Sequence, residues 1–217
     1  MNPIVLIPAR LGSTRLPGKV LADIGGKPMI AHVLERALRA GLGPVAVACG
    51  EAQVAEAVEK AGGIAVMTDP DLPSGSDRIW AALRRLDPAG AHDVIVNLQG
   101  DLPSIDPSYL ATVVKPLAQG FDIGTLVAPI TTEAERDAPS VVKCACAFPE
   151  DAEISPALYF SRHLIPSGEG PHWHHIGIYA YRRAALERFV MLPPSPLERR
   201  EKLCLLYTSP SPRDRTR

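Results

Sequence analysis

Three cationic residues and no acidic residue occupy a short glycine-rich stretch near the N-terminus. Arg10, Arg15 and Lys19 supply the charge, and Gly12 and Gly18 allow the backbone to approach a ligand closely. Cations combined with free backbone N–H groups are the donors that hold a polyphosphate. The stretch therefore predicts a phosphate-binding loop, although a solvated loop with three surface cations would have the same composition.

The spacing within this stretch excludes two familiar phosphate motifs. A Walker A loop needs four residues between its first glycine and Gly-Lys, and then Ser or Thr. Here five residues separate Gly12 from Gly18, and Val20 follows Lys19. No Gly-x-Gly-x-x-Gly follows the first apolar run, so a dinucleotide site of the dehydrogenase kind is also disfavoured.

A second chemical signal is a carboxylate, Asp101, which follows a strongly apolar run. A hard carboxylate beside a flexible glycine, here Gly100, suits a Mg²⁺ ion that bridges phosphate oxygens. An aspartate at such a place could equally be a turn or helix-capping residue if no phosphate loop were present. The two signals together favour a metal–nucleotide site.

Three histidines, His172, His174 and His175, form a further group with ligand chemistry. Alternate residues of a strand share a face, so only His172 and His174 would point the same way. No cysteine or carboxylate is adjacent to them. A transition-metal site is therefore disfavoured.

The elements that would position these residues alternate between short apolar runs and amphipathic helical patterns. This alternation predicts an α/β fold with a parallel sheet covered by helices on both faces and ligands at the carboxyl ends of its strands. Later apolar runs with less helix between them predict an antiparallel or mixed extension. The predicted strands are 3–8, 44–49, 64–67, 93–98, 123–130, 141–148 and 174–181, and the predicted helices are 28–40, 51–61, 76–86, one from about 106, and 196–203.

Composition narrows the class of protein. The 217 residues are 46% hydrophobic with a net charge of −1, so no global field favours nucleic acid or an anionic membrane as a partner. No apolar run approaches the ~20 residues that span a bilayer, and the N-terminus is typical of a strand rather than a signal peptide. The four cysteines form no Cys-x-x-Cys and are expected to be reduced and buried. A cytoplasmic protein is expected.

Residues 204–217 continue no period and contain two prolines two residues apart. We expect them to be foreign sequence joined to a gene that was cut short, or else a disordered basic terminus. Residues 1–203 are expected to form a single domain.

The motif Pro8-Ala-Arg-Leu-Gly-Ser-Thr-Arg-Leu-Pro-Gly-Lys19 resembles the fingerprint of the 3-deoxy-manno-octulosonate (Kdo) cytidylyltransferases, or CMP-Kdo synthetases. The similarity covers nearly everything from Asn2 to Leu203, and its segments are specific together although most are not specific singly. The further segments are residues 26–36, 75–78, 94–101, 157–162, 175–181 and 194–198.

The resemblance implies a nucleotidyltransferase-like, Rossmann-like fold with a mixed, mostly parallel sheet. It implies transfer of the cytidylyl group of CTP to Kdo, with release of pyrophosphate, for lipopolysaccharide synthesis. Mg²⁺ is the implied cofactor, a homodimer the implied assembly, and the bacterial cytoplasm the implied location.

The resemblance also assigns roles to residues. The expected catalytic residues are Arg15, Lys19 and Asp101, of which Asp101 is also the metal ligand. The expected nucleotide-binding residues are Pro8, Arg10, Ser13, Arg15, Lys19, Ser74, Gly75 and Arg78. The expected sugar-binding residues, which offer a cation and mixed donors and acceptors to an acid sugar, are Gln99, Arg162, His175, Tyr179 and Glu198.

The chain departs from the family pattern in two places. Leu102 stands where the family usually has Glu. The family continues past Leu203 to a Val-Asp-Thr-Pro-type motif whose aspartate is a second metal ligand, and this chain has no such segment. On that basis the domain is expected to be incomplete at its C-terminus and the polypeptide inactive or nearly so.

Four alternatives stay open to different degrees. Sialic acid cytidylyltransferases favour Lys-Arg-Ile-Pro-x-Lys-Asn, against Arg15-Leu-Pro-Gly-Lys19 here. A nucleotidyltransferase for a neutral sugar phosphate is disfavoured because no Leu-x-Gly-Gly loop is present. An 8-amino-Kdo acceptor is not distinguished from Kdo by the sequence. A non-catalytic nucleotide-binding module is the alternative from a different class.

Overall fold

The structure is a computed structural model that describes residues 1–12, 16–201 and 203. Two compact units divide the chain: Met1–Leu126 with Gly177–Val190, and Val127–Ile176 with Met191–Arg217. The prediction of a single domain over residues 1–203 stays a prediction. The segment 204–217, with Cys204 in it, and the phosphate-loop residues 13–15 lie outside the described residues.

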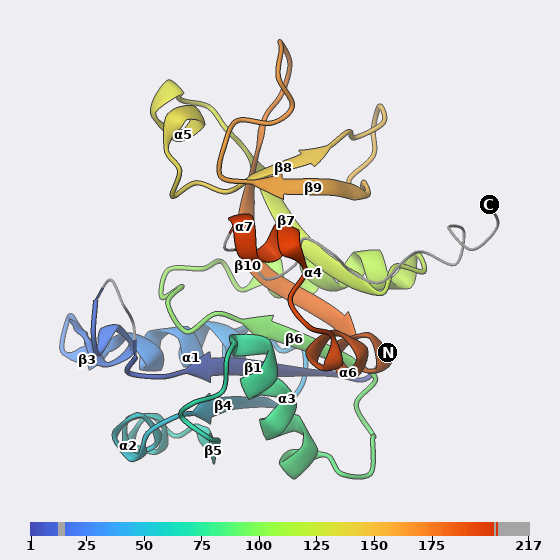
Figure 1. The fold of residues 1–217 in the computed structure, drawn as a ribbon. Helices are drawn as coiled ribbons and strands as arrows, with labels where there is room; N and C mark the ends of the chain where they lie inside the picture. Colours follow the sequence, from blue (N-terminus) through green and yellow to red (C-terminus); the bar gives the residue numbers. More distant parts are fainter. Residues whose placement is uncertain (13–15, 202, 204–217) are drawn as a thin grey trace. The chain divides into compact units, whose positions relative to one another are not determined.

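The first unit is built on a parallel sheet with the strand order β5-β4-β1-β6 (Figure 1). These strands are β1 (Pro3–Ala9), β4 (Val45–Cys49), β5 (Ile64–Met67) and β6 (Val94–Leu98). Every residue of β4 and β6 is buried, which explains why both strands are continuous apolar runs without alternation. Beyond β6, the last residues of β10 (Trp173–Arg182) pair with it in the antiparallel sense.

The helices of this unit include α1 (Met29–Arg39), α2 (Ala52–Lys60), α3 (Gly75–Leu86) and α4 (Ser108–Ala118). In α1 the residues Ile30, Val33, Leu34 and Ala37 recur at helical spacing and are at most 1% exposed. The chain moves outward from β1 through α1 and α2 to β5, and then returns across β1 to β6. Right-handed crossovers therefore place α3 on the sheet face opposite α1 and α2.

A short segment after the phosphate loop adds structure that periodicity did not predict. A 3-10 turn, η1 (Lys19–Leu21), is followed by a hairpin of β2 (Asp23–Ile24) and β3 (Lys27–Pro28). Gly25 and Gly26 form its turn with φ of 60° and 86°, in the region that favours glycine. The hairpin leads directly into α1.

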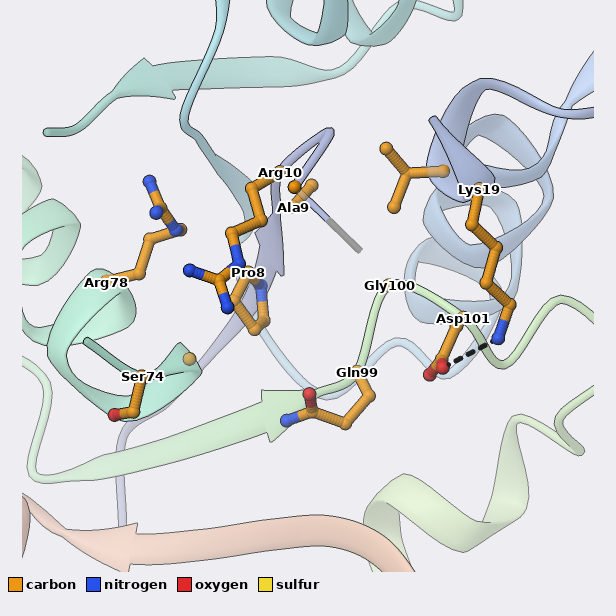
Figure 2. A pocket seen from close by; sticks show the side chains of 12 residues that line it. Pro8, Ala9, Arg10, Lys19, Ser74, Arg78, Gln99, Gly100 and Asp101 are labelled. Carbon is orange, nitrogen blue, oxygen red and sulfur yellow. Dashed lines mark hydrogen bonds and ion pairs between the residues drawn. The ribbon is translucent and has the colours of Figure 1, made fainter. Parts of the chain in front are cut away.

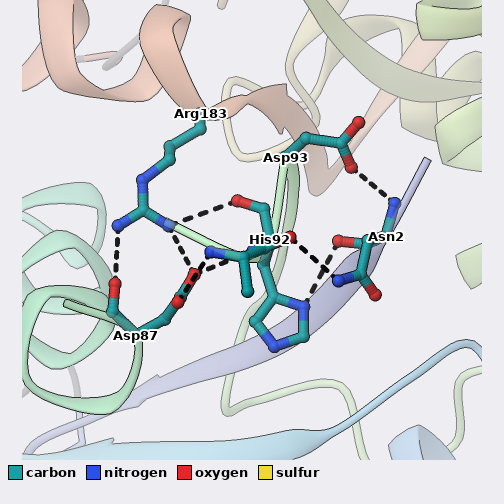
Figure 3. Close-up of polar contacts among 6 residues, drawn as sticks. Asn2, Asp87, His92, Asp93 and Arg183 are labelled. Atoms are coloured by element: carbon teal, nitrogen blue, oxygen red, sulfur yellow. Dashed lines mark hydrogen bonds and ion pairs between the residues drawn. The ribbon is translucent and has the colours of Figure 1, made fainter. Parts of the chain in front are cut away.

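A polar cluster around the buried Asp87 fixes the opposite, amino-terminal end of the sheet (Figure 3). The Asp87 carboxylate accepts hydrogen bonds from the backbone N–H groups of Ala91 and His92, each 2.8 Å away, and from the Arg183 guanidinium at 2.6 Å. The His92 N–H does most to lower the pKa of Asp87, to about 2. This cluster joins the end of α3, the start of β6 and α6 (Arg183–Met191). It lies at the opposite edge of the sheet from the carboxyl ends of β1 and β6, which the predicted phosphate-binding residues follow.

The second unit contains α5 (Glu133–Asp137), β8 (Lys143–Cys146), β9 (Ala157–Ser161) and α7 (Pro196–Glu201). Strand β8 pairs antiparallel with β9 and with Trp173 and His174 of β10. Strands β10 and β7 (Ile123–Pro129) contribute residues to both units, and they pair with each other. Within the described ranges, no helix is both long and apolar enough to cross a membrane.

The predicted architecture is confirmed: a mostly parallel α/β sheet with an antiparallel extension. Most predicted elements are present within two residues of the expected ends, with β8 shorter than expected. Strand β9, the β2–β3 hairpin, α5 and α6 were not predicted as elements. The free cysteines of the described chain are Cys49 and Cys144, which are buried as expected, and Cys146, which is half-buried.

Candidate nucleotide site

A cavity of about 310 Å³ opens where β1 and β6 end, entirely within the first unit (Figure 2). This is the carboxyl edge at which parallel α/β sheets bind ligands. Four short segments contribute its walls: the end of β1, the turn η1, the start of α3, and the residues after β6. Their lining residues are Pro8, Ala9, Arg10, Gly12, Lys19, Val20, Ser74, Gly75, Arg78, Gln99, Gly100 and Asp101.

Lys19 and Asp101 lie together on one side of the cavity, and Arg10 projects between them and Arg78 (Figure 2). The Lys19 Nζ donates to Asp101 Oδ2 at 2.9 Å, and their side chains are 34% and 47% exposed. The expected phosphate cation and the expected metal ligand thus form an ion pair with each other. The pair is therefore a competitor for any ligand that either group would bind through the same atom.

Arg78 lies on the other side and is only 2% exposed. Its Nη1 donates to Thr68 Oγ1 at 2.7 Å and to the Asp69 carbonyl at 3.0 Å, while Nη2 donates to the Pro70 carbonyl at 3.0 Å. Burial lowers the pKa of Arg78, and the neighbouring Arg10 lowers it further. The guanidinium therefore fixes the loop 68–70, which precedes the expected nucleotide-binding residues Ser74 and Gly75.

Two glycines bring the walls close together. A Cβ on Gly100 would lie 2.9 Å from the Pro8 carbonyl oxygen, closer than real Cβ contacts. A Cβ on Gly75 would lie 3.2 Å from Pro8 Cγ. Next to Gly75, the Ser74 Oγ caps α3 by accepting from the Asp77 N–H at 3.2 Å, which fixes the helix end that faces the cavity.

Of the expected sugar-binding residues, Gln99 and Tyr179 belong to this unit. The Gln99 Nε2 donates to Asn97 Oδ1 at 2.9 Å, which orients the side chain at the cavity wall. Tyr179 is opposite Asn97 in the β10–β6 register and is half-buried.

The other three expected sugar-binding residues, Arg162, His175 and Glu198, belong to the second unit. Arg162 Nε donates to the Glu201 carbonyl at 2.9 Å, and the His175 ring packs 4.7 Å from that of Phe160. Desolvation lowers the pKa of His175 to about 4, so its imidazole is neutral near pH 7. The Glu198 carboxylate accepts from the Ser195 N–H at 2.7 Å and so caps α7.

The residues present fit a Mg²⁺ ion that arrives with a nucleotide. Asp101 is the one carboxylate among the lining residues, and no group of three His, Cys, Asp or Glu side chains occurs among the residues that the structure describes. Mg²⁺ keeps several waters and is usually held by one or two carboxylates together with substrate phosphates. Of the expected loop residues, Ser13 and Arg15 lie outside the described part of the chain.

A mostly parallel α/β sheet with cations and a carboxylate at its carboxyl edge defines a nucleotide-binding fold of the nucleotidyltransferase type. The cytidylyltransferase family model matches residues 4–209. The chain belongs to this family and, since a relative named 3-deoxy-manno-octulosonate cytidylyltransferase is 59% identical over 94% of the chain, to the 3-deoxy-manno-octulosonate cytidylyltransferases within it.

Two relatives of that name illustrate the match. The protein of Paramagnetospirillum magneticum is 59% identical over 204 residues, covering 94% of this chain and 83% of its own. That of Rhodospirillum rubrum is 58% identical over 203 residues, covering 93% and 81%. A solved structure of CMP:2-keto-3-deoxy-manno-octonic acid synthetase complexed with CTP superimposes with a TM-score of 0.83 at 41% identity, covering 94% of this chain and 83% of that one.

Sequence reasoning missed three residues that support the expected site residues. Glu51 accepts a hydrogen bond from the start of the phosphate loop. Lys143, fully buried, donates to the Arg162 carbonyl at 3.3 Å, and Glu201 accepts from the Arg162 N–H at 3.1 Å. The position of Glu51, directly after Gly50 at the end of a strand, was the sequence signal that could have identified it. Lys143 in β8 and Glu201 in α7 have no comparable signal in the sequence.

Proposed function

We propose that the chain transfers the cytidylyl group of CTP to 3-deoxy-D-manno-octulosonate, releasing pyrophosphate and forming CMP-Kdo, the donor for lipopolysaccharide synthesis. The observation that carries this proposal is the 59% identity, over 94% of the chain, to a relative named for that activity. The cavity supports it because cations and a carboxylate face one space at the carboxyl edge of the sheet.

The chemistry asked of the protein is positioning and neutralisation of charge. The sugar hydroxyl attacks the α-phosphorus of CTP, and the bond to the β-phosphate breaks as the new P–O bond forms. Negative charge grows on the leaving pyrophosphate, where Lys19 and Arg15 would neutralise it. Arg10 and the glycine-rich backbone would hold the triphosphate, and Ser74 and Gly75 would contact the nucleoside.

We propose Mg²⁺ as the cofactor, with Asp101 as its protein ligand. When bound, the ion supplies Lewis-acid neutralisation of phosphate charge. If Asp101 and Lys19 separate, the carboxylate becomes available to the ion and the ammonium group becomes available to the triphosphate.

For the acceptor, we propose Gln99, Arg162, His175, Tyr179 and Glu198 as the sugar-binding set. Arg162 would pair with the Kdo carboxylate, and the neutral His175 would exchange hydrogen bonds with hydroxyls. We also propose a cytoplasmic homodimer, without nucleic-acid or membrane partners. Leu158, 75% exposed on β9, offers an apolar contact for a second copy, and light scattering of the purified protein tests that assembly.

The experiment measures pyrophosphate release from CTP and Mg²⁺ with three acceptors: Kdo, 8-amino-Kdo and sialic acid. The proposal predicts release with Kdo and at least tenfold less with sialic acid. Release with sialic acid but not Kdo would replace the proposed acceptor. Silence with all three, combined with measurable CTP binding, would indicate a nucleotide-binding module instead.

A further inference from the structure

The backbone of Leu11 makes two hydrogen bonds at the base of the phosphate loop. Its carbonyl accepts a hydrogen bond from the Gly18 N–H at 3.0 Å, which closes the loop at its base. Its N–H donates to Glu51 Oε2 at 2.9 Å. Glu51 thus contacts Leu11, the residue at which the chain enters the loop and to which Gly18, at the loop's end, is hydrogen-bonded.

The corner between β4 and α2 makes a second bond to the same segment. The Gly50 N–H donates to the Ala9 carbonyl at 2.9 Å. Gly50 and Glu51 therefore fix the backbone on each side of Arg10, whose side chain projects into the cavity (Figure 2). The corner packs tightly, because a Cβ on Gly50 would lie 3.1 Å from Arg78 Nη1 and 3.3 Å from Arg10 Cβ.

Glu51 is at the N-cap position of α2, yet its side chain makes no capping hydrogen bond to that helix. An aspartate or serine would serve a cap better, and an acid beside a polyphosphate site opposes the ligand's charge. The contact with Leu11 accounts for a long acidic side chain here, since it reaches across to the neighbouring strand end.

We propose that Glu51 is a positioning residue for nucleotide binding: through the Leu11 N–H it holds the phosphate loop and aims Arg10 at the triphosphate. The inference rests on the proposed CTP-binding function of the cavity. The inference distinguishes two effects of Glu51 on CTP binding. Its acceptor oxygen favours binding, because it holds the loop backbone at Leu11, whereas its negative charge repels the triphosphate.

The test compares Glu51→Ala, which removes the acceptor, with Glu51→Gln, which keeps an acceptor oxygen and removes the charge. Glu56→Ala, an exposed acid on the outer face of α2, is the matched control. Titration calorimetry measures the Kd for CTP with Mg²⁺, and amide hydrogen exchange by NMR reports on the Leu11 N–H. Where turnover is measured, KM for CTP is separated from kcat.

Glu51→Ala should weaken CTP binding about tenfold and deprotect the Leu11 amide, while Glu51→Gln and Glu56→Ala stay within about threefold of wild type. The loss should appear mainly in KM for CTP. If the wild type and the Glu51→Ala variant bind CTP equally well, the inference on Glu51 is overturned, whereas the proposed function stands. A wild type that binds no CTP would overturn the proposed function and this inference with it. Should Glu51→Ala not fold, Glu51→Asp decides, because it keeps the charge but is too short to reach the Leu11 N–H: weaker CTP binding with a deprotected Leu11 amide is expected, and wild-type binding would overturn the inference. A tenfold loss in Glu51→Gln would overturn it as well, because the charge rather than the loop contact would then matter.

Discussion

Replacing Lys19 with Met should affect the two ligands of the cavity in opposite directions. The Lys19 ammonium group pairs with the Asp101 carboxylate at 2.9 Å. Removing it frees the carboxylate for a divalent cation, but it also removes a cation from the expected triphosphate site. The variant should therefore bind a divalent ion more tightly without nucleotide, and CTP less tightly.

The magnitude follows from the exposure of the pair. Side chains that are 34% and 47% exposed are strongly screened by water. Exposed ion pairs contribute about 0.2–1 kcal/mol, so the affinity for a divalent ion alone should rise by up to about fivefold. Loss of a charge-assisted contact to the nucleotide costs about 1.5–3 kcal/mol, so the Kd for CTP should rise by about 10- to 100-fold.

The assay titrates Mn²⁺ into the nucleotide-free protein by electron paramagnetic resonance, and CTP by calorimetry. Lys60→Met, at an exposed position on α2, controls for the loss of one positive charge, and Asp101→Asn should abolish the Mn²⁺ signal at this site. Mn²⁺ binding that weakens or stays unchanged in Lys19→Met would refute the competition between Lys19 and the cation for Asp101.

Two further predictions test the walls of the cavity and the second unit. Gly100→Ala should lower both the CTP affinity and the melting temperature, because the added Cβ would lie 2.9 Å from the Pro8 carbonyl oxygen. Gly177→Ala is the control and should change neither, since its Cβ would lie 3.9 Å from the nearest atom, Gln99 Cγ. Equal behaviour of the two variants by calorimetry would contradict this prediction. Because the folded protein holds His175 neutral with a pKa of about 4, against about 6.5 ordinarily, stability should be fully present above pH 6.5 and decline as the pH falls toward 4. Thermal melts of His175→Phe should show a shallower decline over that window; an unchanged slope would exclude this cause.

The sheet could be predicted from the sequence because burial imposes a residue pattern within each strand and helix. The fully buried strands β4 and β6 are continuous apolar runs, and α1 repeats its apolar residues at helical spacing. The β2–β3 hairpin was missed because each strand has only two residues, too few for a period. Strand β9 was missed as an element because its exposed Leu158 breaks the alternation expected of a half-buried strand.

The cavity was predictable only in part. Residue type and strand-end position identified Lys19 and Asp101, but their mutual ion pair depends on where η1 directs the lysine, which no spacing reveals. Arg78 was expected to bind the nucleotide, whereas its guanidinium donates to Thr68, Asp69 and Pro70, because burial favours saturation of its donors by nearby oxygen atoms. Long-range partners such as Glu51 are set by the tertiary fold.

The most direct test of the proposed function follows the phosphorus atoms of CTP during incubation with Kdo and Mg²⁺. With label on the α-phosphate, the account predicts that the label appears in a Kdo-linked CMP product, while label on the γ-phosphate appears in pyrophosphate. Label that remains in CTP, or label that appears in inorganic phosphate, would contradict it.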